Sequence, residues 1–144
     1  MFLLDEFPRL GKVNAMLDGL ATLRSKRVSM CLIVQSLAQL DMIYGQNERK
    51  VIADTCAYKA ILGATDADTQ DYFSRLVGTY DKVMTSHGTN DNFLGLPMGK
   101  STNTHEVEKR IIKPEEFGTL HDIVLLTPHG MIRVDKTPYY LNKE

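Results

Sequence analysis

Two adjacent carboxylates near the start of the chain, Asp5 and Glu6, have the residue types and spacing for phosphate chemistry. They follow the apolar run Phe2–Leu4 and are closed off by Pro8, a pattern that predicts a short strand buried on both faces of a parallel sheet. Ligands of such sheets bind outside the carboxyl ends of the strands, where these two side chains would stand. In nucleoside triphosphatases this arrangement is the Walker B motif. Its first carboxylate helps hold the water shell of Mg²⁺, and its second orients or deprotonates the attacking water.

A neutral amide, Gln35, follows the next predicted strand, residues 28–34, in the same way. At the end of a strand beside the Walker B candidate, it can touch the γ-phosphate or the attacking water and report hydrolysis to the segment behind it, which is a sensor role. Structural alternatives stay open for both groups. Asp5 and Glu6 can be a strand end that caps the next helix, and Gln35 can cap the following turn.

The elements that must position these side chains alternate between strand and helix. Apolar positions recur at three- and four-residue spacing from Leu10 to Leu23, which predicts a helix between the first two strands. The further predicted elements are helices over 36–45 and 48–55, a strand at 59–63, and a helix from Asp66 or Asp68 to Gly78. The alternation predicts an α/β fold, a three-layer structure with a mainly parallel sheet.

The C-terminal part of the chain differs in composition. Residues 85–106 are rich in Ser, Thr, Asn, Gly and His, which predicts a flexible loop. Residues 107–144 are expected to contain a helix after Pro114 and a β-hairpin around the turn 127–130. They would complete the domain that residues 1–84 begin.

The string from Gly95 to Ser101 imitates a phosphate-binding loop without fulfilling its requirements. Leu94 stands where the first glycine is needed, and the string follows the Walker B candidate instead of preceding it. A true loop of this kind connects a strand to a helix, so that its amides surround the phosphates. The chain is therefore expected to contain no Walker A motif.

Length and composition limit the remaining function classes. A chain of 144 residues with 43% hydrophobic and 24% charged residues is typical of one globular domain, and its net charge of −1 gives no overall attraction to nucleic acid. Cys31 and Cys56 lie in apolar runs, which predicts buried, reduced thiols. The four histidines lack ligand spacing, so no metal beyond Mg²⁺ is expected. Because the chain starts directly in a strand, we expect it to be a fragment of a longer protein.

Several strings resemble the TraG/TraD-like coupling proteins of type IV secretion and conjugation. The most specific are LDEFPRLGK at 4–12 and IVQSLAQL at 33–40, followed by IYG at 43–45, ILGATD at 61–66, LVG at 76–78 and TPYY at 137–140. The resemblance implies the C-terminal half of a RecA-like ATPase domain. Residues 1–84 would form the motor half, and the match is weakest over 85–106.

What the resemblance implies for the site follows position by position. Asp5 and Glu6 look like the Walker B pair, with Asp5 holding Mg²⁺ through water, and Gln35 looks like the sensor. Arg24 falls where such proteins place an arginine that reaches the nucleotide of the neighbouring subunit. ATP and Mg²⁺ would be the cofactors of the full-length parent. This fragment is expected to bind neither and to be inactive alone, since the Walker A strand and loop would precede Met1.

The resemblance also implies partners and a location. The parent would be a homo-hexamer at the cytoplasmic face of the bacterial inner membrane, held by an N-terminal anchor outside this soluble fragment. It would deliver a relaxase–single-stranded DNA complex or protein effectors to components of the secretion channel. Two other functions stay open: a non-catalytic docking module for secretion partners, and another DNA translocase of the FtsK or HerA type. A phosphate-binding loop upstream of Met1 would distinguish the motor from the docking module.

Overall fold

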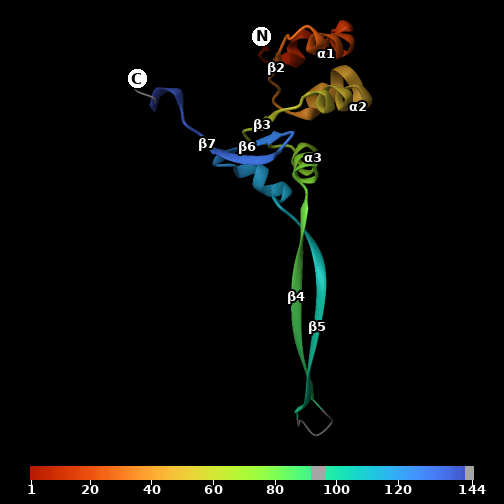
Figure 1. Cartoon of the computed structure of the whole chain (residues 1–144), viewed down its shortest axis with the longest axis vertical. Helices are drawn as coiled ribbons and strands as arrows, with labels where there is room; N and C mark the ends of the chain where they lie inside the picture. Colours follow the sequence, from red (N-terminus) through yellow and green to blue (C-terminus); the bar gives the residue numbers. More distant parts are fainter. Residues whose placement is uncertain (92–96, 142–144) are drawn as a thin grey trace.

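The computed structural model describes residues 1–91 and 97–141 of the chain (Figure 1). Its helices and strands are, in order, β1 (Phe2–Leu4), α1 (Ala15–Ser25), β2 (Met30–Leu32), α2 (Leu37–Thr55), β3 (Lys59–Ile61), α3 (Ala67–Val77), β4 (Thr79–Asp91), β5 (Pro97–Arg110), β6 (Asp122–Thr127) and β7 (Gly130–Asp135). Short 3-10 helices lie at Phe7–Leu10, Pro114–Thr119 and Tyr139–Leu141. The strands and helices alternate up to Val77, which confirms the predicted α/β class. No described helix has the length and apolar character needed to cross a membrane.

The strands pair in three separate groups. β1 and β2 are parallel, with Leu4 opposite Leu32, so their carboxyl ends lie at the same edge. β3 does not extend this pair, although its sequence predicts a strand of the parallel sheet. It pairs antiparallel with β6, where Ile61 lies opposite Val124 and both side chains are buried. The predicted C-terminal hairpin therefore supplies the apolar partner of β3, and β6 and β7 form that hairpin as expected.

The first strand is less buried than its apolar sequence predicts. Phe2 and Leu3 are 57% and 59% exposed, so the prediction of burial on both faces is wrong for β1 in the described structure. The reason is that β1 pairs with β2 alone. Cys31 of β2 is likewise exposed, so the prediction that its thiol is buried is wrong. Cys56 is half-buried, and neither cysteine forms a disulfide.

The buried side chains form two hydrophobic cores. The first, between β1, α1 and α2, contains Phe7, Met16, Leu37, Leu40, Tyr44 and Ile52. The second, between β3, β6 and the 3-10 helix Pro114–Thr119, contains Ile61, Ala64, Ile112, Phe117 and Val124. Adjacent residues of α3 join them, because Tyr72 packs against the first core and Phe73 against the second.

Two buried hydroxyl groups tie α3 to both sides. Thr69 accepts a hydrogen bond of 3.2 Å from the backbone N–H of Leu37, at the start of α2. Ser74 donates one of 2.7 Å to the backbone carbonyl of Ile112. The predicted ends of this helix are confirmed. Asp66 caps its first turn, and Gly78 ends it at φ 100°, a conformation that glycine adopts without steric cost.

α2 consists of two helical segments joined at a kink, at the place where the sequence predicts one helix to end and another to follow. Ser36 caps its first turn by accepting from the N–H of Gln39. Gly45 interrupts the helical backbone with φ 74° and ψ 162°. The predicted end of the first helix near residues 44–45 is therefore confirmed, and the helical backbone resumes after the glycine.

β4 and β5 form a long antiparallel ribbon that projects away from the rest of the molecule (Figure 1). Residues 85–91 and 97–106 are strand, so the interpretation of 85–106 as a loop without secondary structure is wrong for these described residues. Their polar composition led to the wrong prediction of a loop. Both faces of a free ribbon are exposed to solvent, so such strands do not require apolar side chains. The predicted mobility of this segment stays a prediction. A helical turn follows Pro114 as expected, although residues 107–110 still belong to β5.

Candidate functional site

The carboxyl ends of β1 and β2 carry the predicted site residues. Backbone hydrogen bonds continue past both strands: the N–H of Ile33 donates to Leu4 at 3.0 Å, and the N–H of Phe7 donates to Ile33 at 2.9 Å. This pairing holds the turn after β1 against the segment after β2. The Nε2 group of Gln35 donates to Oε1 of Glu6 at 3.3 Å. The structure therefore brings together Glu6 and Gln35, which are 29 residues apart in sequence.

Glu6 stands in an uncommon backbone conformation. Its φ of 44° and ψ of 48° are left-handed helical values, which a residue with a long side chain adopts only at a cost. Its N–H donates to Oδ1 of Asp5 at 2.9 Å, so the exposed carboxylate of Asp5 stabilises the turn. The sharp turn places two consecutive carboxylates at the strand end.

Both carboxylate oxygens of Glu6 are engaged. Oε1 accepts from Gln35, and Oε2 forms an ion pair of 2.5 Å with Nε of Arg9. The Arg9 side chain is 82% exposed. Solvent-exposed ion pairs contribute only about 0–1 kcal/mol, so Glu6 can exchange this partner for a water molecule or a ligand at small cost.

A second glutamine extends the hydrogen-bonded chain into α2. Nε2 of Gln39 donates to Oε1 of Gln35 at 3.4 Å, so the amide of Gln35 is held between Glu6 and the first turn of α2. A cavity of about 360 Å³ opens beside this chain, lined by Glu6, Pro8, Arg9, Gln35, Gln39, Met42 and Ile43. The sequence patterns did not single out Gln39 or Arg9. Gln39 could have been found from its four-residue spacing from Gln35 at a helix start.

The floor of this site is packed and rigid. Phe7, which follows Glu6, is fully buried and stacks on Tyr44 of α2, with ring centroids 5.6 Å apart. The Tyr44 hydroxyl donates to the carbonyl of Gly11 at 3.3 Å and accepts from the N–H of Val13 at 3.2 Å. The 3-10 helix Phe7–Leu10 is thereby clamped onto α2, which fixes where Glu6 leaves β1.

Arg24 is not brought to this edge. It lies in the last turn of α1, and its side chain is outside what the structure describes. The backbone returns from α1 to the amino end of β2, where the N–H of Val28 donates to Leu23 and the N–H of Phe2 donates to Ser29. Arg24 therefore lies toward the sheet edge opposite the carboxyl ends that carry Glu6 and Gln35.

The donor atoms at the site suit Mg²⁺. Asp5, Glu6 and Gln35 offer only oxygen ligands, which Mg²⁺ prefers, and it is commonly held by one or two carboxylates and water. Across residues 1–91 and 97–141 no group of three or more His, Cys, Asp or Glu side chains is placed to hold a metal on its own. An ion here would need water or a phosphate ligand to complete its coordination.

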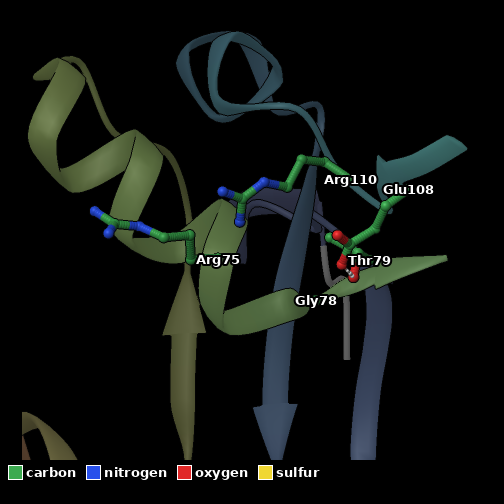
Figure 2. A pocket seen from close by; sticks show the side chains of 5 residues that line it. All are labelled: Arg75, Gly78, Thr79, Glu108 and Arg110. Atoms are coloured by element: carbon green, nitrogen blue, oxygen red, sulfur yellow. Dashed lines mark hydrogen bonds between the residues drawn. The ribbon is translucent and has the colours of Figure 1, made fainter.

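A second cavity, of about 390 Å³, lies at the root of the ribbon (Figure 2). Figure 2 shows Arg110 extending toward α3, where its closest carboxylate partner is Asp71 at 4.0 Å, while Glu108 bends onto Thr79. Asp71 also pairs with Arg75. These contacts join the ribbon to the end of α3. The residues that line the cavity therefore have a structural role.

The imitation of a phosphate-binding loop lies at the far end of the ribbon. Residues 97–101 are strand, with Lys100 paired in register with Thr89, and no helix begins there. Residues 95–96 lie outside the described residues. The string therefore lacks the strand–loop–helix context that a phosphate-binding loop requires.

Comparisons with known proteins agree on one family. A family model described as the TraM recognition site of TraD and TraG matches residues 1–122. Protein VirD4 of Agrobacterium fabrum is 26% identical over 99% of this chain, and the conjugal transfer protein TraG of Escherichia coli is 28% identical over 81% of it. The chain spans only 21% and 18% of their lengths.

A solved structure shares the fold. The bacterial conjugative coupling protein TrwB, in an unbound form, superposes with a TM-score of 0.75 at 19% identity, covering 98% of this chain and 31% of TrwB. TrwB in complex with a non-hydrolysable ATP analogue gives a TM-score of 0.72 over the same share of this chain. This likeness confirms the expected α/β fold, which the chain shares with part of TrwB.

Proposed function

The chain belongs to the family described as the TraM recognition site of TraD and TraG, and from this membership we propose that it forms the C-terminal half of the motor domain in a type IV secretion coupling ATPase. One observation carries the proposal further than the family alone. Glu6 and Gln35, from the ends of two parallel strands, meet in a hydrogen bond at the edge where such sheets bind nucleotide. TrwB, described as a plasmid coupling protein, has been solved with an ATP analogue and with ADP and Mg²⁺, which supports the same ligands for the full-length protein.

In this proposal Asp5 helps hold the water shell of Mg²⁺, and Glu6 orients or deprotonates the attacking water. Bound Mg²⁺ would supply neutralisation of the charge that develops on the transferred phosphate. Glu6 must first exchange Arg9 for water, which its exposed ion pair permits. When Glu6 turns to water, the amide of Gln35 becomes free to donate to a phosphate oxygen.

Gln39 connects the proposed sensor, Gln35, to helix α2. It is bonded to Gln35 and belongs to the first turn of α2, so a rotation of the Gln35 amide changes a contact of that helix. The same helix start donates a hydrogen bond to α3, from the N–H of Leu37 to the hydroxyl of Thr69. Changes at the phosphate would reach α3 along this path.

Arg24 is proposed to act on a neighbouring subunit. Because α1 ends toward the sheet edge opposite Glu6, Arg24 cannot serve the site of its own chain without a large rearrangement. In a ring, that opposite edge can face the next subunit's nucleotide. An arginine supplied in this way accelerates hydrolysis by roughly 10³–10⁵-fold in comparable triphosphatases.

A mixing experiment on the full-length protein tests both roles. We expect Glu6→Gln to lower ATPase activity by about 10²–10⁴-fold, as for loss of a general base, and Arg24→Ala to lower it as well. Rings that mix the two variants should recover part of the activity, because some interfaces pair an intact Glu6 with an intact Arg24. The matched control is Glu115→Gln, which changes an exposed glutamate of the 3-10 helix Pro114–Thr119 that does not line the site.

The outcomes separate the roles. Mixed rings, verified by native mass spectrometry, that recover no activity would remove Arg24 from the site, as would a fully active Arg24→Ala ring. Unchanged ATPase activity in Glu6→Gln would overturn the Walker B assignment. It would favour the alternative of a non-catalytic docking module, which the family description supports because it names a recognition site.

The partners and location follow from the same membership. We propose that the full-length protein is a hexamer at the cytoplasmic face of the inner membrane, anchored by a segment N-terminal to this chain. It would bring a relaxase–single-stranded DNA complex or protein effectors to the secretion channel. The relatives named above include a conjugal transfer protein and a conjugative coupling protein, which supports this class of cargo.

A further inference from the structure

The ribbon of β4 and β5 has one face that carries negative charge. Directly opposite residues of an antiparallel pair lie on the same face, and neighbours along a strand lie on opposite faces. The register puts Asp81 opposite Glu108 and Val83 opposite Glu106, so three carboxylates and an exposed valine share a face. We call this the acidic face.

The other face carries positive charge and apolar surface. Here Tyr80 lies opposite Lys109 and Lys82 lies opposite Val107, so two lysines stand diagonally to each other. Tyr80 and Met84, on the same face, are 48% and 44% exposed. We call this the basic face.

Neither face satisfies its charges within the chain. In the described part of the structure Asp81, Lys82, Glu106 and Lys109 form no ion pair. Like charges directly opposite each other, such as Asp81 and Glu108, destabilise a strand pair. Arg110 cannot offset the acidic face, because it extends toward Asp71 of α3 (Figure 2).

We propose that the ribbon packs against the ribbon of a second copy of this chain, with the acidic face of one copy on the basic face of the next. The complementary charges are carried by the same two strands at the same distance from the root of the ribbon. Asp81 and Lys82 are adjacent residues, as are Glu108 and Lys109. A copy displaced by the thickness of one ribbon, without sliding along it, therefore brings Lys82 near Asp81 and Lys109 near Glu108.

A second copy fits both faces better than other occupants do. A nucleic acid would be attracted to Lys82 and Lys109, but it would leave Asp81, Glu106 and Glu108 unpaired. The contact between copies is head-to-tail, since each chain uses one face for each neighbour. Such interfaces close into rings or extend into filaments. Val83 and Met84, on opposite faces, would add apolar burial to both contacts.

The proposal goes beyond the proposed ATPase role, because this surface is apart from the candidate site and needs no nucleotide. We would measure sedimentation velocity of the chain without nucleotide at about 0.01 M and about 1 M salt, where the Debye length falls from roughly 30 Å to 3 Å. Association should depend on concentration at low salt and disappear at high salt.

Charge reversal gives the decisive comparison. Reversing the acidic face (Asp81→Lys with Glu106→Lys) gives a chain with two positive faces, and reversing the basic face (Lys82→Glu with Lys109→Glu) gives one with two negative faces. Each variant alone should be monomeric at low salt. An equimolar mixture should associate, because each face can again meet a face of opposite net charge.

Controls with the same net-charge change lie outside the ribbon: Asp54→Lys with Glu115→Lys, and Lys26→Glu with Lys50→Glu. Both should associate as the unchanged chain does. Circular dichroism verifies that each variant is folded, and Lys82→Gln with Lys109→Gln, a milder change, should weaken association. A monomeric unchanged chain at all concentrations would overturn the proposal, as would a mixture of reversed variants that stays monomeric. Failure here would leave the Glu6 and Arg24 experiments unaffected.

Discussion

Replacing Thr69 by valine should destabilise the chain, because the backbone N–H of Leu37 would lose its hydrogen-bond acceptor. Thr69 is 3% exposed, and its hydroxyl accepts from the N–H of Leu37 at the start of α2. Valine keeps the shape and branching of threonine but cannot accept a hydrogen bond. The N–H of Leu37 would then be buried without a partner, two residues after Gln35.

The magnitude follows from the burial of that group. Leaving a buried donor unsatisfied costs about 1–3 kcal/mol, while threonine and valine have similar helix propensities, so the backbone effect of the substitution is small. With a urea m-value of about 2 kcal/mol/M, the unfolding midpoint should fall by about 0.5–1.5 M. The contact at α2 should also loosen locally.

Urea denaturation followed by far-UV circular dichroism measures the first effect, and amide hydrogen exchange at Leu37 measures the second. The matched control is Thr22→Val in α1, whose exposed hydroxyl bonds only to carbonyls of its own helix. We expect the control to change stability by less than about 0.5 kcal/mol. Equal midpoints for the two variants, or unchanged exchange at Leu37, would refute the assignment of this bond as a link between α2 and α3.

Two further predictions concern titrating side chains. Burial raises the pKa of the Tyr72 phenol above its ordinary 10.0, which favours the neutral form in the folded state. The contribution of Tyr72 to the free energy of unfolding should therefore be constant below about pH 10 and fall as the pH rises toward the raised pKa. Tyr72→Phe should remove that part of the decline in urea titrations between about pH 8 and pH 11. Burial also raises the pKa of the Cys56 thiol, whereas Cys31 is exposed; in a chromogenic disulfide-exchange assay at pH 8, Cys31→Ser should slow the reaction much more than Cys56→Ser, and equal rates would contradict the burial of Cys56.

Elements with a strong local signal could be predicted from the sequence. The capping role of Asp66, the stop at Gly78 and the hairpin of β6 and β7 each depend on neighbouring residues, and all three are present. The partner of β3 could not be predicted, because it is set by Val124 more than 60 residues later. The ribbon left no periodic apolar signal, since both its faces are solvent-exposed in this chain.

The candidate site shows the same division. That Glu6 and Gln35 would lie together follows from two parallel strands whose carboxyl ends share an edge, and the structure brings these side chains into contact. The ion pair of Glu6 with Arg9 depends on the 3-10 helix Phe7–Leu10. This helix could not be predicted, because no repeating pattern of apolar residues marks it in the sequence. Their catalytic roles stay predictions until the variants above are measured.

The left-handed backbone of Glu6 has a consequence for how this position can vary. Left-handed values cost an ordinary residue about 1–2 kcal/mol, whereas glycine adopts them freely, so Glu6→Gly should leave the fold at least as stable. A library selected only for thermal stability would therefore accumulate glycine at position 6. A library selected for DNA or protein transfer would retain glutamate there if the proposed role holds. The two selections would then favour different residues at position 6. Sequencing the selected variants would show whether glutamate is retained there for its carboxylate, in spite of the backbone strain.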